Sequence, residues 1–157
     1  MKQILTFMFM LAASAATFGQ SKSFDALSHA FSDRDNVTSF NLGGLGLKWT
    51  SDEDDKTLNG IRDVRFLNIP RTQFDAGNVK VSSVKRDLSR DSFEELFSAR
   101  DGKDNVSVYL QENRGQNNNL YFVLVEGDEN VFALELKGYI DPKSLKDKKT
   151  RSKITGM

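Results

Sequence analysis

The fold is decided by the region from Asn105 to Ile140, which reads NVSVYLQENRGQNNNLYFVLVEGDENVFALELKGYI. Three apolar runs of strand length are separated by NRGQNN and GDEN, two short stretches of turn-forming residues. Together with SFEELFSAR and the turn DGKDN before them, they predict four strands in an antiparallel meander. Alternation predicts that one set of side chains points into the core: Val106, Val108, Leu110, Leu120, Phe122, Leu124, Phe132, Leu134 and Leu136.

The segments on either side of the meander predict further helices and strands. SFDALSHAFSDRD is typical of a helix with Ser23 as its N-cap, and VTSFNL and GIRDVRFLNI are expected to be strands. We expect a helix from about Phe74 to Arg90, and another that starts at Asp141 and Pro142. This order predicts one α+β domain, with a largely antiparallel sheet and helices mainly on one face.

The first residues, MKQILTFMFMLAASAATFGQ, have the layout of a secretory signal peptide. The apolar run is shorter than the ~20 residues that a membrane-spanning helix needs. We therefore expect a signal peptide over residues 1–19 and an exported chain, periplasmic or secreted, from a Gram-negative bacterium. Without cysteine, the chain cannot be lipid-anchored through that residue. The domain is expected over 20–149, followed by a disordered basic tail over 150–157.

The overall composition argues against several kinds of partner and site. The 22 Lys and Arg balance the 22 Asp and Glu, so no net positive charge attracts nucleic acid. The absence of cysteine excludes disulfides and thiolate metal ligands. No segment after the signal peptide is long and apolar enough to be a transmembrane helix. Stability must therefore come from packing.

The glycine-rich and acidic stretch SFNLGGLGLKWTSDEDDKTLNG, residues 39–60, looks at first like a phosphate or calcium loop. Gly43, Gly44 and Gly46 do not have the spacing of a dinucleotide fingerprint or a P-loop. The acids lack the closing Gly and Glu of an EF-hand loop. We therefore interpret the stretch as a mobile connection, and Trp49 within it needs a place to pack.

No catalytic, cofactor or metal site is predicted. Asp25, His29 and Asp33 are four residues apart on the first helix, a spacing that could align metal ligands or an acid/base pair. The helical wheel places His29 opposite the apolar face of that helix, so the three are expected to face solvent. His29 is the only histidine, and the chain has no Gly-x-Ser-x-Gly nucleophile motif.

Several of these segments together resemble the domain-of-unknown-function family 4252, which comprises small exported bacterial proteins. They are FDALSHAF, VTSF, GIRDVRFLNI, SFEELFSARDGKDNVSVYLQE and FALELKGYIDPKSL. The resemblance covers nearly the whole chain after the signal peptide. It implies export and an α+β fold, and it implies no activity or site residues. GGLGLKWTSDEDD departs from the more helical, apolar segment that is typical of the family after the first strand.

The strand NLYFVLVE carries the main functional hypothesis. If Leu120, Phe122 and Leu124 face the core, Tyr121, Val123 and Val125 lie on the opposite face, with Tyr109 adjacent on the neighbouring strand. Helices on one side only would leave these four residues as an open apolar patch, a feature typical of partner surfaces. The alternative is a central strand whose second face is covered by residues 43–55 or by the C-terminal helix.

The function that follows is an exported, non-enzymatic domain that acts through contacts with an unknown protein or cell-envelope component. Weak self-association through the open sheet face is expected as well. The alternative is a small secreted hydrolase or ligand-binding protein, whose pocket is covered by the loop from Gly43 to Gly60. A third hypothesis is attraction of the basic residues 143–153 to anionic lipid or polymer.

Overall fold

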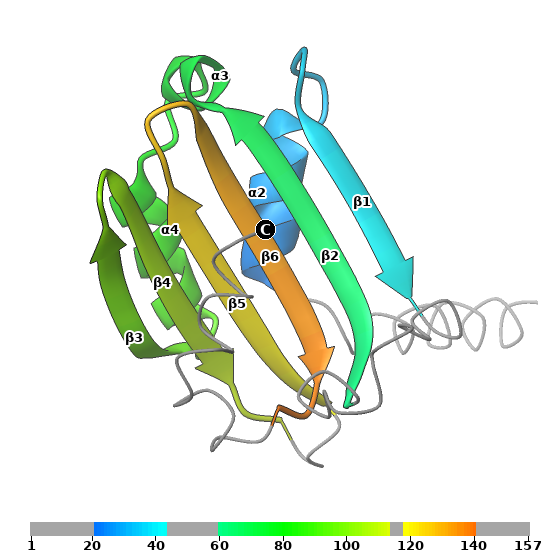
Figure 1. Ribbon diagram of the computed structural model, residues 1–157. Coiled ribbons are helices and arrows are strands. Elements are labelled where there is room, and N and C mark those ends of the chain that lie inside the picture. Colours follow the sequence, from blue (N-terminus) through cyan, green and yellow to red (C-terminus); the bar gives the residue numbers. More distant parts are fainter. Residues whose placement is uncertain (1–20, 44–59, 114–117, 141–157) are drawn as a thin grey trace, which may run out of the picture.

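The protein forms one six-stranded antiparallel sheet with its longer helices on one face (Figure 1). The computed structural model describes residues 21–43, 60–113 and 118–140. The strand order across the sheet is β1-β2-β6-β5-β4-β3. The strands are β1 (Thr38–Gly43), β2 (Ile61–Pro70), β3 (Glu94–Asp101), β4 (Asp104–Gln111), β5 (Asn119–Glu126) and β6 (Asn130–Gly138). The helices are α2 (Lys22–Phe31), α3 (Arg71–Ala76) and α4 (Val81–Arg90). This arrangement confirms the predicted α+β fold.

The last four strands form the predicted meander. Each pairs antiparallel with the next, from β3 through β4 and β5 to β6. The β3–β4 turn is tight because Gly102 adopts a φ of 61°, a conformation that costs glycine little. β6 then pairs with β2, and β2 with β1, so the two early strands extend the meander on its β6 side.

The first helix forms as predicted, but its N-cap does not lie at Ser23. Ser21 caps α2, and its side chain accepts a hydrogen bond of 3.1 Å from the backbone N–H of Phe24. Ser23 is buried instead, and its hydroxyl hydrogen is shared between two acceptors, the backbone oxygen of Asp87 at 3.1 Å and the carboxylate of Asp91 at 3.0 Å. Ser23 therefore joins α2 to the C-terminal half of α4.

The single helix expected from Phe74 to Arg90 is in fact two helices. α3 ends at Ala76, and α4 begins at Val81. Between them Asn78 has a φ of 55°, in the left-handed region that commonly ends a helix. Because the chain turns there, Phe74 and Leu88 approach the same core from different helices.

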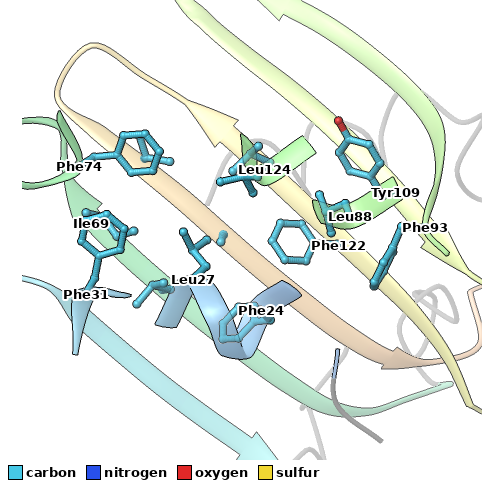
Figure 2. Close-up of a cluster of buried hydrophobic side chains, with 14 of the residues drawn as sticks. Phe24, Leu27, Phe31, Ile69, Phe74, Leu88, Phe93, Tyr109, Phe122 and Leu124 are labelled. Carbon is cyan, nitrogen blue, oxygen red and sulfur yellow. The ribbon is translucent and has the colours of Figure 1, made fainter. Parts of the chain in front are cut away.

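The main core lies between the sheet and the helices (Figure 2). Leu120, Phe122 and Leu124 of β5 point into it, as predicted. The other six predicted inward residues lie on the opposite face, because each pairs directly with Tyr121, Val123 or Val125 of β5. The prediction was therefore wrong for Val106, Val108, Leu110, Phe132, Leu134 and Leu136.

Several predictions fall outside the described residues. They concern the signal peptide over 1–19, Gly44, Gly46 and Trp49, the helix from Asp141, and the tail over 150–157. Gly43 itself is the last residue of β1. Within the described ranges, no helix is both long and apolar enough to cross a membrane.

Candidate functional site

The two faces of the sheet differ in what packs on them. The core on one face includes side chains from all three described helices. Among residues 21–43, 60–113 and 118–140, the clusters on the other face consist of strand side chains and Ile140, and we call this face the second face. Figure 1 shows α2 and α4 behind the sheet, with the second face toward the viewer. Its apolar side chains lie in three cross-strand rows: Leu42, Val64, Leu136, Tyr121 and Leu110, then Phe40, Phe66, Leu134, Val123, Val108 and Phe97, and then Phe132, Val125 and Val106.

Three of the four predicted surface residues lie on the second face. Tyr121 and Val123 are only 4% and 3% exposed, and Val125 is half-buried. The Tyr121 hydroxyl accepts a hydrogen bond of 3.2 Å from the backbone N–H of Ile140, whose side chain packs in the same cluster. The chain after β6 therefore returns across this end of the sheet, and Tyr121 and Val123 are not an open patch.

The prediction that Tyr109 lies beside Tyr121 is wrong. Tyr109 pairs with Phe122 across the β4–β5 ladder, so it points toward the helices, where it packs near Phe93 and Leu88 (Figure 2). Among the described residues its buried hydroxyl has no hydrogen-bond partner within 3.5 Å. Burial raises the pKa of Tyr109 to about 12, and the carboxylate of Glu95 adds to the rise. Tyr109 is therefore a core residue.

The accessible part of the second face lies at β1. Phe40 and Leu42 are 45% and 43% exposed, the highest values among its large apolar residues. Phe40 stacks on Phe66 of β2 with ring centroids 4.9 Å apart, and Phe66 lies 6.0 Å from Phe132 of β6. These rings form an aromatic row that begins at the edge of the sheet and continues inward over three strands. We call Phe40, Leu42, Phe66 and Phe132 the β1 patch.

The two edge strands differ in their chemistry. β1 has the sequence TSFNLG, without a charged residue, and all six of its residues are exposed. β3, at the opposite edge, has the sequence EELFSARD and a register irregularity between Glu95 and Phe97. Charges and bulges are the usual means by which edge strands avoid pairing with other chains. β3 therefore has that protection, and β1 lacks it.

A buried ionic cluster lies on the helix face, where β2, β6 and α2 meet. Arg65 and Glu135 pair across the β2–β6 ladder, and Nε and Nη2 of the arginine both donate to Oε1 of Glu135, at 2.9 and 2.6 Å. Nη1 donates to the carboxylate of Asp25 at 2.5 Å. The hydroxyl of Ser21 donates to the other oxygen of Glu135. The guanidinium also lies 4.3 Å from the centroid of the Phe24 ring.

This cluster fixes the start of α2 to the sheet. Burial raises the pKa of Glu135, while the Ser21 hydroxyl and the positive charge of Arg65 oppose the rise. Every acid in the cluster already has a partner, so the arrangement has the features of a structural ion pair. Alternation with Leu134 and Leu136 in the core predicted that Glu135 points away from the helices, so this ion pair was not predicted. Opposite charges at facing strand positions were the signal that could have revealed it.

Asp25, His29 and Asp33, predicted at helical spacing on one helix, do not form a cluster, and Asp33 lies beyond the end of α2 at Phe31. Asp25 contacts Arg65, while His29 and Asp33 are exposed to solvent, as the helical wheel indicated. The described part of the chain contains no group of three or more His, Cys, Asp or Glu side chains that could hold a metal ion.

A protein-family model matches about three quarters of the chain. The model of the domain of unknown function DUF4252 matches residues 31–147. The chain belongs to the DUF4252 family. The DUF4252 match contains all six strands, α3 and α4, whereas α2 precedes it except for Phe31. Comparison with curated proteins and with solved structures found no match. Membership in DUF4252 thus confirms the resemblance and assigns no activity.

Proposed function

We propose that this DUF4252 protein is an exported, non-enzymatic domain that acts through contacts with another protein or with a cell-envelope surface. The observation that carries the proposal is the β1 patch, in which exposed apolar side chains meet an unprotected sheet edge. Contiguous exposed apolar surface next to polar surroundings is typical of interaction sites. The proposed contact surface is therefore the β1 patch, in place of the buried Tyr121 and Val123.

The arrangement of the patch supports contact rather than a role in the core. The main core on the helix face is complete without β1, since none of its buried residues comes from that strand. Phe40 stacks on Phe66 of β2 and Leu42 pairs with Val64 of that strand, but each residue stays more than two fifths exposed. Aromatic side chains are enriched in the centres of protein interfaces, where their large area is buried at low entropic cost.

The ionic cluster supports the non-enzymatic part of the proposal. Its two carboxylates are held by Arg65, and Glu135 is 3% exposed, so the group has a stabilising role that needs no substrate.

The sequence of residues 1–19 supports export, because it has a basic start, an apolar centre and small residues near its end. Cell fractionation with mass spectrometry of the N-terminus tests this part. The proposal expects a chain that starts near residue 20 outside the cytoplasm, and an unprocessed cytoplasmic chain would contradict it.

The contact surface is tested by affinity capture from the native envelope fraction. The test variant carries Phe40→Lys and Leu42→Lys, and the control carries Leu96→Lys on β3, where the leucine is 42% exposed. We expect the double variant to recover at least about tenfold less of a specific partner, equivalent to about 1.4 kcal/mol. The control should recover as much as the unmodified protein. Equal recovery by all three, with equal urea midpoints, would refute the β1 patch as the contact surface.

A further inference from the structure

The outer edge of β1 presents backbone N–H and C=O groups with which another strand could form hydrogen bonds. In an antiparallel sheet, alternate residues of a strand direct their N–H and C=O groups to opposite neighbours. Within the described residues β1 pairs only with β2, and it does so without a register irregularity from Thr38 to Gly43. All six β1 residues are exposed, and Figure 1 shows β1 as the outermost strand on its side of the sheet. Half of its backbone groups therefore point outward from the sheet.

The sequence of β1 permits pairing with a second copy of itself. It has no charge, so two copies of β1 can face each other without like-charge repulsion. An antiparallel pair of identical strands is related by a twofold axis, which makes the contact self-complementary. The opposite edge, β3, has charged residues at Glu94, Glu95, Arg100 and Asp101. Pairing through β1 alone therefore gives a closed dimer, because the remaining β3 edges resist further addition.

We propose that β1 pairs antiparallel with β1 of a second copy of this chain, so that one sheet continues through both copies. Phe40 faces Phe40 of the second copy in this pairing, Thr38 faces Leu42, and Ser39 faces Asn41. This register keeps the second faces of both copies on the same side of the joined sheet. It leaves Gly43 outside the new ladder, so the absence of a side chain there does not weaken the packing between the two strands. The aromatic row from Phe132 to Phe40 then continues across the twofold axis.

The proposed contact is small. A pairing of five residues from each chain is smaller than the about 1,200 Å² of a standard interface, so the dimer is weak and reversible. The proposal goes beyond the proposed function and stands without it, because it needs only purified protein and the backbone edge of β1. A separate envelope partner on the β1 patch is neither required nor excluded by the pairing.

Cysteine cross-linking tests both the dimer and its register, since the chain has no cysteine of its own. Single variants Ser39→Cys, Phe40→Cys and Asn41→Cys are compared with Ala99→Cys on β3, all in protein purified as processed by cells. Directly opposed Cα atoms in an antiparallel pair are about 4.5–5.5 Å apart, within disulfide range. Diagonal positions are about 7–8 Å apart, which is too far for efficient bridging.

The expected result is a disulfide dimer that forms at least about tenfold faster in Phe40→Cys than in the other three variants. Sedimentation velocity should show a dimer fraction that rises with concentration and is lost in Phe40→Lys, a change that places two like charges directly opposite each other in this register. An unmodified chain that stays monomeric at every concentration would overturn the proposal. So would fastest cross-linking at another position, or a monomer whose β1 patch captures a different partner instead.

Discussion

Replacing Arg65 with methionine would test the buried ion pair most severely. Arg65→Met keeps much of the side-chain bulk but leaves Glu135, 3% exposed, with the Ser21 hydroxyl and no positive charge. Removal of one partner of a buried pair costs about 3–5 kcal/mol. Loss of the guanidinium above the Phe24 ring adds about 0.5–2 kcal/mol. We therefore expect the free energy of unfolding to fall by about 4 kcal/mol or more.

The same substitution should change how stability depends on pH. Burial raises the pKa of Glu135 from its usual 4.5, and Arg65 opposes that rise, so Arg65→Met raises the pKa further. A folded-state pKa above the unfolded value means that the folded state favours the protonated carboxyl. The contribution is fully present below the unfolded value and is lost as pH rises through the folded value. The destabilisation by Arg65→Met should therefore be larger at about pH 8 than at about pH 5.

Urea unfolding of a double-mutant cycle measures both effects. The cycle uses Arg65→Met, Glu135→Leu and the double variant, which should recover most of the lost stability because no buried charge remains. Asp25→Asn is the matched control, since the Asp25 side chain is 56% exposed and its ion pair contributes at most about 1 kcal/mol. A loss below about 1 kcal/mol for Arg65→Met, or the same loss at both pH values, would show that Arg65 does not compensate a buried Glu135 charge.

Two further pairs of substitutions test the packing. Gly138→Ala should lower the free energy of unfolding by about 2–5 kcal/mol, because its φ is 146° and a Cβ there would lie 2.0 Å from a backbone oxygen. Gly102→Ala has open space around it and should cost only about 1–2 kcal/mol. Equal losses in thermal or urea unfolding would contradict this difference. Tyr121→Phe should cost about 0.5–1.5 kcal/mol because a hydrogen bond is lost, while Tyr109→Phe should be neutral or stabilising because its hydroxyl has none. A larger loss for the Tyr109 variant would contradict the assignment.

Much of the fold could be predicted from local patterns in the sequence. Alternation and turn residues were enough for the meander, and β5 runs over the same residues as the predicted strand, Asn119–Glu126. The apolar spacing of Phe24, Leu27 and Phe31 was enough for α2 and its buried face. These features depend on neighbours within a few residues, which a sequence displays directly.

The relative facing of neighbouring strands could not be predicted in the same way. Alternation assigns residues to two faces within one strand, but the turn between strands decides which set faces the helices. The predicted alternation was offset by one residue in β4 and β6, so it assigned their side chains to the wrong faces. As a result, Tyr109 was expected on the outer face, and Glu135 was expected to point away from the helices. The β1 patch was missed for another reason, because edge position depends on the strand order of the whole sheet.

The most direct test of the β1 patch as the contact surface is site-specific photocross-linking in growing cells. A photoreactive phenylalanine analogue is placed at Phe40 and, as a matched control, at Leu96 on the opposite edge strand, which is exposed to a similar extent. We expect a discrete cross-linked product from position 40, either with a second copy or with an envelope protein, and none from position 96. No product from position 40, or the same products from both positions, would contradict it.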